Sequence, residues 1–471
     1  MNLKTANIIT LGSILGAAVS FCTVPIITWF FSQEDIGRFS MYQLALNLGM
    51  ILISLDMHQA YVREYYETEQ KEQLLKISLF SGSVVFAIVF LISEVLNFSL
   101  SKLLFNIESR VIDVFVLLGI YITFIINILV HVLRMHNFAW AFAFTQVIPK
   151  IGYIVVLGVG VYFYKNYNYN FLIYANIFVL LLSLGCLIFF LKKDLYKAII
   201  IKLDRKKLNQ MLAFSLPLVF GSLSYWALTS IDRVFLKNLS NYNELAIYAV
   251  ASTLAGGIGV LVTVFSNLWH PIVYKWMEEG IDSKKVLAIN ELMVIFICLL
   301  WSFVGMFSWI VLYFFPQSYS GVASILVGCI AMPLLYMLSE TTTIGIGLTR
   351  KTIYAMFATL IALILNISIN YFLVEKYGAK ATTIASMSAF TLFLILRTEF
   401  SSFLWMSLSR WRMYVAVLLY FSITLLIVLE VFSGKINNAF IWFLSLFFVL
   451  SLYFTRVKRL FESLRLRDFK W

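Results

Sequence analysis

Long apolar runs recur along almost the whole chain, and they decide what it can fold into. A membrane-crossing helix needs about 20 apolar residues, and fourteen such runs can be counted. No soluble core could shelter them, because 61% of the residues are hydrophobic and 13% are charged, against about half and about a quarter in soluble domains. The sequence therefore predicts an all-α polytopic membrane protein. The expected spans are residues 7–31, 39–60, 77–97, 112–134, 140–164, 171–191, 210–236, 244–269, 286–314, 322–347, 352–374, 380–401, 413–433 and 439–456.

Lysine and arginine are distributed unevenly over the segments between these runs. If the N-terminus is placed inside, the inner segments carry 25 of these residues and the outer segments carry 8. Positive charge accumulates on the cytoplasmic side of membrane proteins. We therefore expect both chain ends, including the basic C-terminal tail, to be cytoplasmic.

The net charge of +12 does not indicate a nucleic-acid partner, because the cations lie in short loops between apolar runs. The four cysteines, Cys22, Cys186, Cys298 and Cys329, all fall within apolar runs and form no CxxC or Cys/His pattern. We interpret them as small buried hydrophobic residues. The sequence predicts no metal site.

Two halves of the chain show a weak internal similarity. "FFSQEDIGRFSMYQLALNLGMILISL" follows the first run, and "FLKNLSNYNELAIYAVASTLAGGIGVLV" follows the seventh. Six spans separate the two segments, so both would lie the same way in the membrane, as in transporters built from parallel repeats. We expect a six-helix bundle over 1–191, a basic cytoplasmic linker over 192–209, a second bundle over 210–401, and two further spans with a basic tail over 402–471.

Two segments resemble a known family. "FSLPLVFGSLSYWALTSIDRVFLKNLSNYNELAIYAVASTLAGG", residues 214–257, resembles the seventh and eighth helices of polysaccharide and O-antigen flippases of the multidrug/oligosaccharidyl-lipid/polysaccharide exporter superfamily. "LNISINYFLVEKYGAKATTIAS", residues 365–386, is similar to a second stretch of these proteins, with Asn366 and Asn370 spaced i, i+4 and a Tyr377-Gly378 turn. Lys380-Ala381 departs from the usual Gly-Ala pair.

The resemblance implies two pseudo-symmetric six-helix bundles of the kind found in multidrug (MATE) exporters. It implies a flippase that moves undecaprenyl-diphosphate-linked oligosaccharide, such as an O-antigen or capsule repeat unit, from the inner to the outer leaflet of a bacterial plasma membrane. It also implies that the protein is not an enzyme and has no organic cofactor, although H⁺ or Na⁺ coupling is compatible with it. The expected partners are the glycolipid, membrane lipids, a glycan polymerase and a chain-length regulator.

Charged residues within apolar spans are the candidate site residues, because each costs at least ~2.5–3.5 kcal/mol at a helix centre. Lys150 is the sharpest case. It lies about 15 Å from either interface, whereas a lysine stem reaches about 6 Å, and Pro149 beside it favours a kink. Lys150 is expected to face a substrate cavity, or alternatively to pair with a carboxylate on another span.

Other candidates for substrate binding are charged residues that a diphosphate could meet. Asp232 and Arg233 point about 100° apart on a helix, so each needs its own partner, and Arg233 could hold a phosphate or tie two helices together. Arg63, Arg134 and Arg397 are placed near cytoplasmic span ends, where a cation could receive the diphosphate or act as an ordinary anchor.

Glu340, in "LSETTTIGIG", is the deepest carboxylate and the candidate for an ion-coupling group, or alternatively the partner of a basic residue. Two rival functions stay open. A multidrug exporter of the same superfamily would favour acidic groups for cationic drugs, whereas here the midspan charge is basic. A membrane-embedded glycan polymerase or ligase would ordinarily carry a large outer loop, and the longest outer loop here, between the third and fourth spans, has about 14 residues.

Overall fold

The computed structural model describes residues 3–136, 138–163, 168–279, 284–406, 409–431, 438–456 and residue 458. Within these residues every regular element is helical. Twelve of the described helices are long and apolar enough to cross a membrane, and two shorter apolar helices cover Ile14–Phe30 and Asn438–Leu452. The prediction of an all-α membrane protein with about fourteen spans is confirmed. The basic tail expected after residue 456 lies outside the described residues, apart from residue 458.

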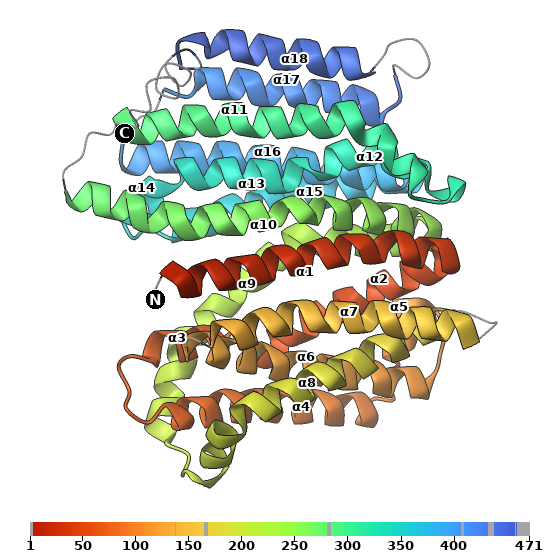
Figure 1. Ribbon diagram of the computed structural model, residues 1–471, viewed down its shortest axis with the longest axis vertical. Helices are drawn as coiled ribbons and strands as arrows, with labels where there is room; N and C mark the ends of the chain where they lie inside the picture. The colour runs from red at the N-terminus through yellow and green to blue at the C-terminus, as the bar shows by residue number, and fades with distance from the viewer. Residues whose placement is uncertain are drawn as a thin grey trace. The chain divides into compact units, whose positions relative to one another are not determined.

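The chain divides into two compact units, Met1–Ser230 and Ile231–Trp471, and their boundary falls within a single helix, α9. The division of the chain into segments 1–191, 192–209, 210–401 and 402–471 stays a prediction. The helices of the first unit, drawn in red to yellow-green in Figure 1, are α1 (Leu3–Phe30), α2 (Gln33–Ser54), α3 (Met57–Glu64), α4 (Lys71–Val95), α5 (Leu100–Phe105), α6 (Arg110–Met135), α7 (Ala139–Phe163), α8 (Tyr169–Ile200) and the first part of α9 (Arg205–Leu239).

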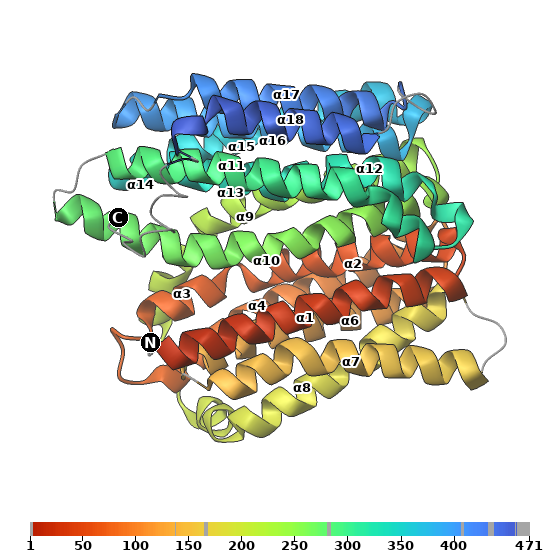
Figure 2. The ribbon, with the colours of Figure 1, turned by 45° about the horizontal axis from the view of Figure 1, so that its top comes forward.

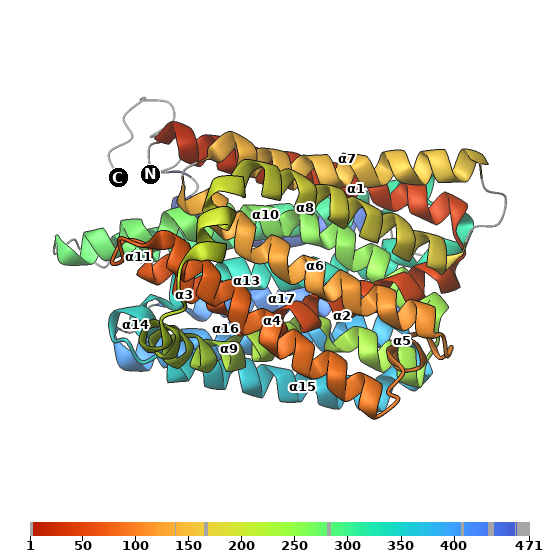
Figure 3. The ribbon, with the colours of Figure 1, turned by 90° about the horizontal axis from the view of Figure 1, so that it is seen from below.

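Within the first unit the long helices pack in pairs. Helix α1 lies along α7, and Figure 3 shows the two side by side. Helix α6 packs against α2 and α8, and α7 also contacts α8. Side-chain caps define where helices begin: Ser32 accepts a hydrogen bond from the backbone N–H of Asp35 at 3.1 Å, and Asn168 accepts from that of Phe171 at 3.3 Å. Such caps satisfy amides that have no partner within the helix.

The second predicted span is broken. Leu55 and Asp56 both adopt a left-handed backbone, with φ of 48° and 51°, so α2 ends at Ser54 and α3 begins at Met57. Non-glycine residues seldom adopt this conformation, which costs on the order of 1–3 kcal/mol each. Two consecutive left-handed residues therefore mark a position where the surrounding structure enforces the break.

The predicted linker 192–209 is largely helical. Helix α8 continues to Ile200, and α9 begins at Arg205. The ammonium group of Lys76 on α4 donates to the backbone oxygens of Ile199 and Ile201, at 2.9 and 2.5 Å. A cation is well placed there, because the last carbonyls of a helix lack partners within it.

The second unit contains the remaining helices. Helices α15 and α16 form an antiparallel pair, α13 packs on α16, and α10 packs on α12 and α13. Helices α17 and α18 lie side by side in Figure 2, and α18 also packs along α11. The elements are the end of α9, α10 (Tyr242–Glu278), α11 (Lys284–Phe307), η1 (Ser308–Tyr313), η2 (Gln317–Tyr319), α12 (Gly321–Cys329), α13 (Ala331–Thr342), α14 (Ile344–Leu348), α15 (Ile353–Tyr377), α16 (Ala379–Leu404), α17 (Trp411–Val428) and α18 (Asn438–Leu452).

A tight turn at Gly378 joins α15 to α16. Its φ of +52° combines with a ψ of −128°, a conformation that side-chain-bearing residues rarely adopt. The carboxylate of Glu244, at the start of α10, occupies the space where a Cβ would stand. The same carboxylate accepts the backbone N–H of Ala379 at 2.9 Å, so it caps the start of α16.

We predict that Gly378→Ala lowers the free energy of unfolding by at least about 2 kcal/mol, because it combines an unfavourable backbone conformation with a clash against Glu244. Thermal unfolding of the purified protein in detergent measures this. The matched control is Gly257→Ala, on α10, where an added Cβ meets no atom within 4 Å. The control should be neutral, or stabilising by up to ~1 kcal/mol. Equal stability of the two variants would contradict the prediction.

Candidate functional site

Glu340 lies at the centre of a charged cluster in the second unit. Its carboxylate is 2.8 Å from the guanidinium Nη1 of Arg397 on α16, and 2.7 Å from Nε2 of His270 on α10. The side chains of Glu340 and Arg397 are 5% and 12% exposed, whereas that of His270 is 32% exposed. We call these three residues the Glu340 cluster. It joins α10, α13 and α16 through one carboxylate.

Neighbouring groups fix the geometry of the Glu340 cluster. The guanidinium group of Arg397 lies over the rings of Tyr336 and Phe393, at 5.6 and 4.9 Å from their centroids, and it donates to the hydroxyl of Ser339 at 2.7 Å. Stacked planar cations of this kind are held in one orientation. Arg397 and Glu340 neutralise one another, and His270 lies at the exposed edge of the cluster.

Asp232, on the last part of α9, is the hub of a second cluster. Its carboxylate is fully buried and accepts hydrogen bonds from four side chains on three other helices. The donors are the Tyr248 hydroxyl at 2.6 Å, the Asn370 amide at 2.8 Å, the Asn366 amide at 3.2 Å, and the Ser386 hydroxyl. We call these five residues the Asp232 cluster.

The Asp232 cluster offers oxygen atoms of three kinds, namely carboxylate, amide and hydroxyl, and these are the ligands that hard cations prefer. The amide oxygen of Asn370 is buried and has no hydrogen-bond partner among the described residues. A proton on the carboxylate, or a small monovalent cation among these oxygens, would fit the donor set. No group of three or more His, Cys, Asp or Glu side chains arranged to hold a metal ion occurs among the described residues.

Lys150 lies within α7, and its ammonium group points at α1. Its Nζ is 2.9 Å from the backbone oxygen of Gly16, and its side chain is partly buried. Gly16 leaves room for this approach, because a Cβ there would lie 3.3 Å from the lysine nitrogen. Among the described residues no carboxylate lies within ion-pairing distance of Lys150. Among the described residues, the carbonyl dipole of Gly16 is therefore what holds its charge.

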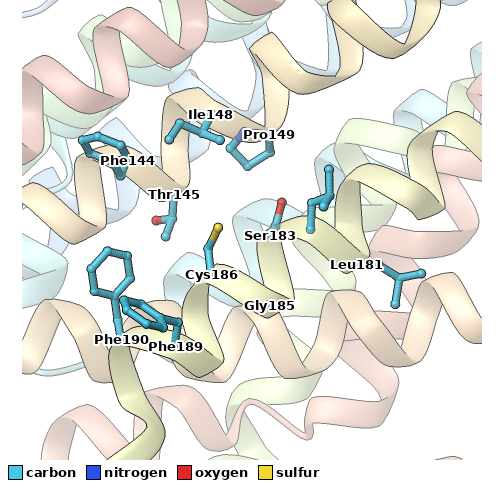
Figure 4. A pocket seen from close by; sticks show the side chains of 11 residues that line it. Phe144, Thr145, Ile148, Pro149, Leu181, Ser183, Gly185, Cys186, Phe189 and Phe190 are labelled. Atoms are coloured by element: carbon cyan, nitrogen blue, oxygen red, sulfur yellow. The ribbon is translucent and has the colours of Figure 1, made fainter.

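A cavity of about 500 Å³ opens beside Lys150, between α7 and α8. Figure 4 shows Pro149 and Ile148 of α7 facing Cys186 and Phe189 of α8 across it. Lys150 is not among its lining residues. An apolar lining of this kind suits hydrocarbon rather than a charged headgroup. The lining residues are Phe144, Thr145, Ile148, Pro149, Leu181, Leu182, Ser183, Gly185, Cys186, Phe189 and Phe190.

The remaining predicted basic residues have different surroundings. Arg233 follows Asp232, has a buried Nε without a hydrogen-bond partner, and forms no ion pair within the described residues. The guanidinium group of Arg63 lies 4.4 Å from the centroid of the Phe214 ring. Arg134 is exposed in the last turn of α6, where a cation interacts favourably with the helix carbonyls.

Sequence reasoning missed several members of the two clusters. It placed Arg397 and Glu340 in separate roles, and it assigned no role to His270 or Tyr248. The pair Asn366 and Asn370 was noted as a motif, but not as hydrogen-bond partners of Asp232. The i, i+4 spacing of the two asparagines was an available signal, because it puts both amides on one face of α15.

Three comparisons with known proteins bear on this geometry. A family model described as polysaccharide biosynthesis protein matches residues 3–277, which is more than half of the chain. The chain belongs to the polysaccharide biosynthesis protein family. Among curated proteins, Lsg locus protein 1 of Haemophilus influenzae is 23% identical over 291 residues, covering 60% of this chain and 67% of that protein.

Solved structures agree on the fold. The lipid II flippase MurJ in an inward closed conformation matches with a TM-score of 0.66 and 16% identity, over 98% of this chain and 100% of MurJ. An inward-facing multidrug resistance MATE transporter of the MOP superfamily matches with a TM-score of 0.58 and 14% identity, over 83% of this chain and 94% of the transporter. The predicted MATE-like fold and the predicted membership of a polysaccharide family are thus confirmed, and the chain is a multi-pass membrane protein.

We predict that Arg397→Met destabilises the protein by about 3–5 kcal/mol, because it leaves Glu340 buried without its guanidinium partner. The double variant Arg397→Met/Glu340→Leu should recover most of that loss, since both charges are then removed. Thermal unfolding in detergent distinguishes the two variants. If the double variant is less stable than the single variant, the Glu340–Arg397 pair is not the dominant interaction at this position.

Proposed function

We propose that the protein flips a polyprenyl-diphosphate-linked oligosaccharide, of the O-antigen or capsule repeat-unit type, from the cytoplasmic to the outer leaflet of a bacterial plasma membrane. The step is transport by alternating access, without covalent chemistry. Family membership and the likeness of the fold to a lipid II flippase support this proposal. Both termini are then cytoplasmic, as the distribution of lysine and arginine indicates.

The uncompensated charge of Lys150 is the observation that carries the proposal. A lysine deep in an apolar span, opposed in the described structure only by the carbonyl of Gly16, is costly unless an anion approaches it. A diphosphate supplies that anion, and Arg233 is a second cation without an ion pair in the described structure. A multidrug exporter would instead need exposed acidic groups to bind cationic drugs. The cations Lys150 and Arg233, unpaired among the described residues, therefore favour an anionic substrate.

The two parts of the substrate need different environments. The diphosphate and sugars cannot cross hydrocarbon unaided, so they need a polar path lined by cations. The proposed contacts are Lys150, Arg63 and Arg134 of the first unit and Arg233 of the second, whereas Arg397 is already engaged by Glu340. The polyprenyl tail can stay in the lipid. The partners are therefore the glycolipid and membrane lipids, together with a glycan polymerase and chain-length regulator that act after the flip.

The membrane potential can supply part of the driving force. An inside-negative potential favours outward movement of an anion by about 2.3 kcal/mol per charge per 100 mV. A coupled ion can supply the rest. We propose that Asp232, with its four side-chain partners, binds that ion as H⁺ or Na⁺. Glu340, the earlier candidate, is already engaged by Arg397 and His270.

Reconstitution tests the proposed function directly. Purified protein in vesicles should accelerate the transfer of a fluorescent polyprenyl-diphosphate oligosaccharide between leaflets, measured by its accessibility to a membrane-impermeant reagent. Empty vesicles give the background rate. A protein that exports organic cations but leaves the glycolipid at the background rate would support the multidrug reading instead.

We predict that Lys150→Ala lowers the glycolipid flipping rate at least ~10-fold, because one charge-assisted hydrogen bond contributes about 1.5–3 kcal/mol. Lys150→Arg should retain more activity, since it keeps the charge. The control is Ile151→Ala, at the neighbouring exposed position on α7, which should flip at the wild-type rate. Full activity of Lys150→Ala would remove this lysine from the proposed path.

We further predict that Asp232→Asn abolishes the dependence of flipping on a sodium or proton gradient, while part of the potential-driven rate remains. The substitution keeps the shape of the side chain and removes its charge, so its effect reports ion binding. Flipping is measured with the gradient and the potential imposed separately. An unchanged gradient dependence in Asp232→Asn would assign coupling to another group.

A further inference from the structure

Asp56 lies at the break between α2 and α3 and is 2% exposed. Its left-handed backbone leaves the carboxylate without an N-capping hydrogen bond to α3. Ser222, on the first-unit part of α9, donates to the carboxylate at 2.6 Å. A single neutral donor compensates a buried charge only in part. Asp56 is therefore a carboxylate that a nearby cation would stabilise.

Two histidine rings lie near the α2–α3 break, and one of them, His58, faces Asp56. His58, on the first turn of α3, has its Nδ1 3.8 Å from the nearer carboxylate oxygen, which is too long for a hydrogen bond. The ring of His131 on α6 lies against that of His58, with centroids 4.7 Å apart and planes tilted by 33°. Two rings this close cannot both hold a proton without strong like-charge repulsion. The pair is therefore suited to bind one proton.

Both histidines have ring nitrogens without partners. The Nδ1 atoms of His58 and His131 are buried and have no hydrogen-bond partner within the described residues. Thr123 and Asn127 also have buried oxygens without partners there. Thr123, Asn127 and His131 follow at i, i+4 and i+8, so they form one stripe along α6. Unpaired polar atoms in such a line are unusual and indicate a path for water and protons.

Most other charged groups at this end of the first unit are already engaged. Arg134, one turn after His131, adds a positive field, and Arg63 lies over Phe214. Lys150, on the adjacent α7, is held by Gly16 on α1. The paired groups of α3, α4, α6, α8 and α9 are Glu64 with Lys207, Glu72 with Lys197, His136 with Asp194, Lys71 with the Tyr65 ring, and Lys76 with the backbone oxygens of α8.

We infer that His58, His131 and Asp56 form a proton-binding site at the α2–α3 break, and that a proton bound there slows flipping. The proton charges the histidine pair, and His58 then forms an ion pair with Asp56. This ion pair fixes the start of α3 at the α2–α3 break. Loss of the proton frees α3 to move. A metal ion fits less well, because ring nitrogens bind a metal in the plane of the ring, and two rings packed against each other do not direct their nitrogens to one ion. The effect on flipping rests on the proposed function, whereas proton binding does not.

Direct proton binding is measured by NMR of the histidine side chains in the purified protein between about pH 4 and 8, a range that extends well below the titration of free histidine near pH 6.5. The chain has four histidines, so single substitutions assign each signal. The wild-type pair should take up one proton in a coupled step. His58→Gln should remove that coupling and change the titration of His131, and Asp56→Asn should weaken proton binding.

Flipping is then followed in vesicles as the pH on the α3 side is lowered from about 8 to 5. The wild-type rate should fall at least ~3-fold, a change that His58→Gln and His131→Gln should each abolish. His136→Gln, which removes a histidine paired with Asp194 at the same end, is the matched control and should keep the wild-type pH response. Thermal unfolding verifies that each variant is folded.

The possible outcomes distinguish proton binding by the histidine pair from the proposed flipping activity. Independent titration of His58 and His131, or an unchanged pH response in both glutamine variants, would overturn the proton site. A failure to flip the glycolipid at any pH would overturn the proposed function, while the NMR titration would still decide whether the pair binds a proton.

Discussion

The hydrocarbon of a membrane offers no hydrogen bonds, and this constraint governs the whole structure. Backbone amides that cross it must be satisfied within helices, which accounts for a chain whose described elements are all helical. The same medium penalises every charge it surrounds. Each charged side chain within a span must therefore be compensated by a nearby group. The kind of compensation distinguishes charged groups with a structural role from those that bind an ion or a substrate.

Three manners of compensation occur in the described residues. Glu340 meets Arg397 and His270, so opposite charges cancel in place. Asp232 is surrounded by neutral donors on three other helices, which satisfies its oxygens and leaves its charge uncancelled. Lys150 has a single carbonyl. The first arrangement mainly ties helices together, whereas the second and third leave a charge for a mobile ion or a substrate to neutralise.

The sequence predicted the membrane fold and its number of spans because apolar run length is a direct consequence of bilayer thickness. It also singled out Lys150, Asp232, Glu340 and Arg397, since a charge in an apolar run is visible without a structure. It could not show that Arg397 binds Glu340, because those residues are 57 positions apart. The break at Leu55 and Asp56 escaped prediction as well. Aspartate adopts a left-handed backbone occasionally, but leucine gives no signal for one, and tertiary packing imposes it there.

The turn at Gly378 has a mechanical consequence. Since the carboxylate of Glu244 fills the concavity of the turn and holds the first amide of α16, the beginning of α10 is fastened to the α15–α16 hairpin. These three helices should travel as one body during any transport cycle. We expect bending instead at helix interruptions such as Thr343, between α13 and α14, and Leu55–Asp56, between α2 and α3. Labels placed across those interruptions would then register movement that labels across Gly378 would not.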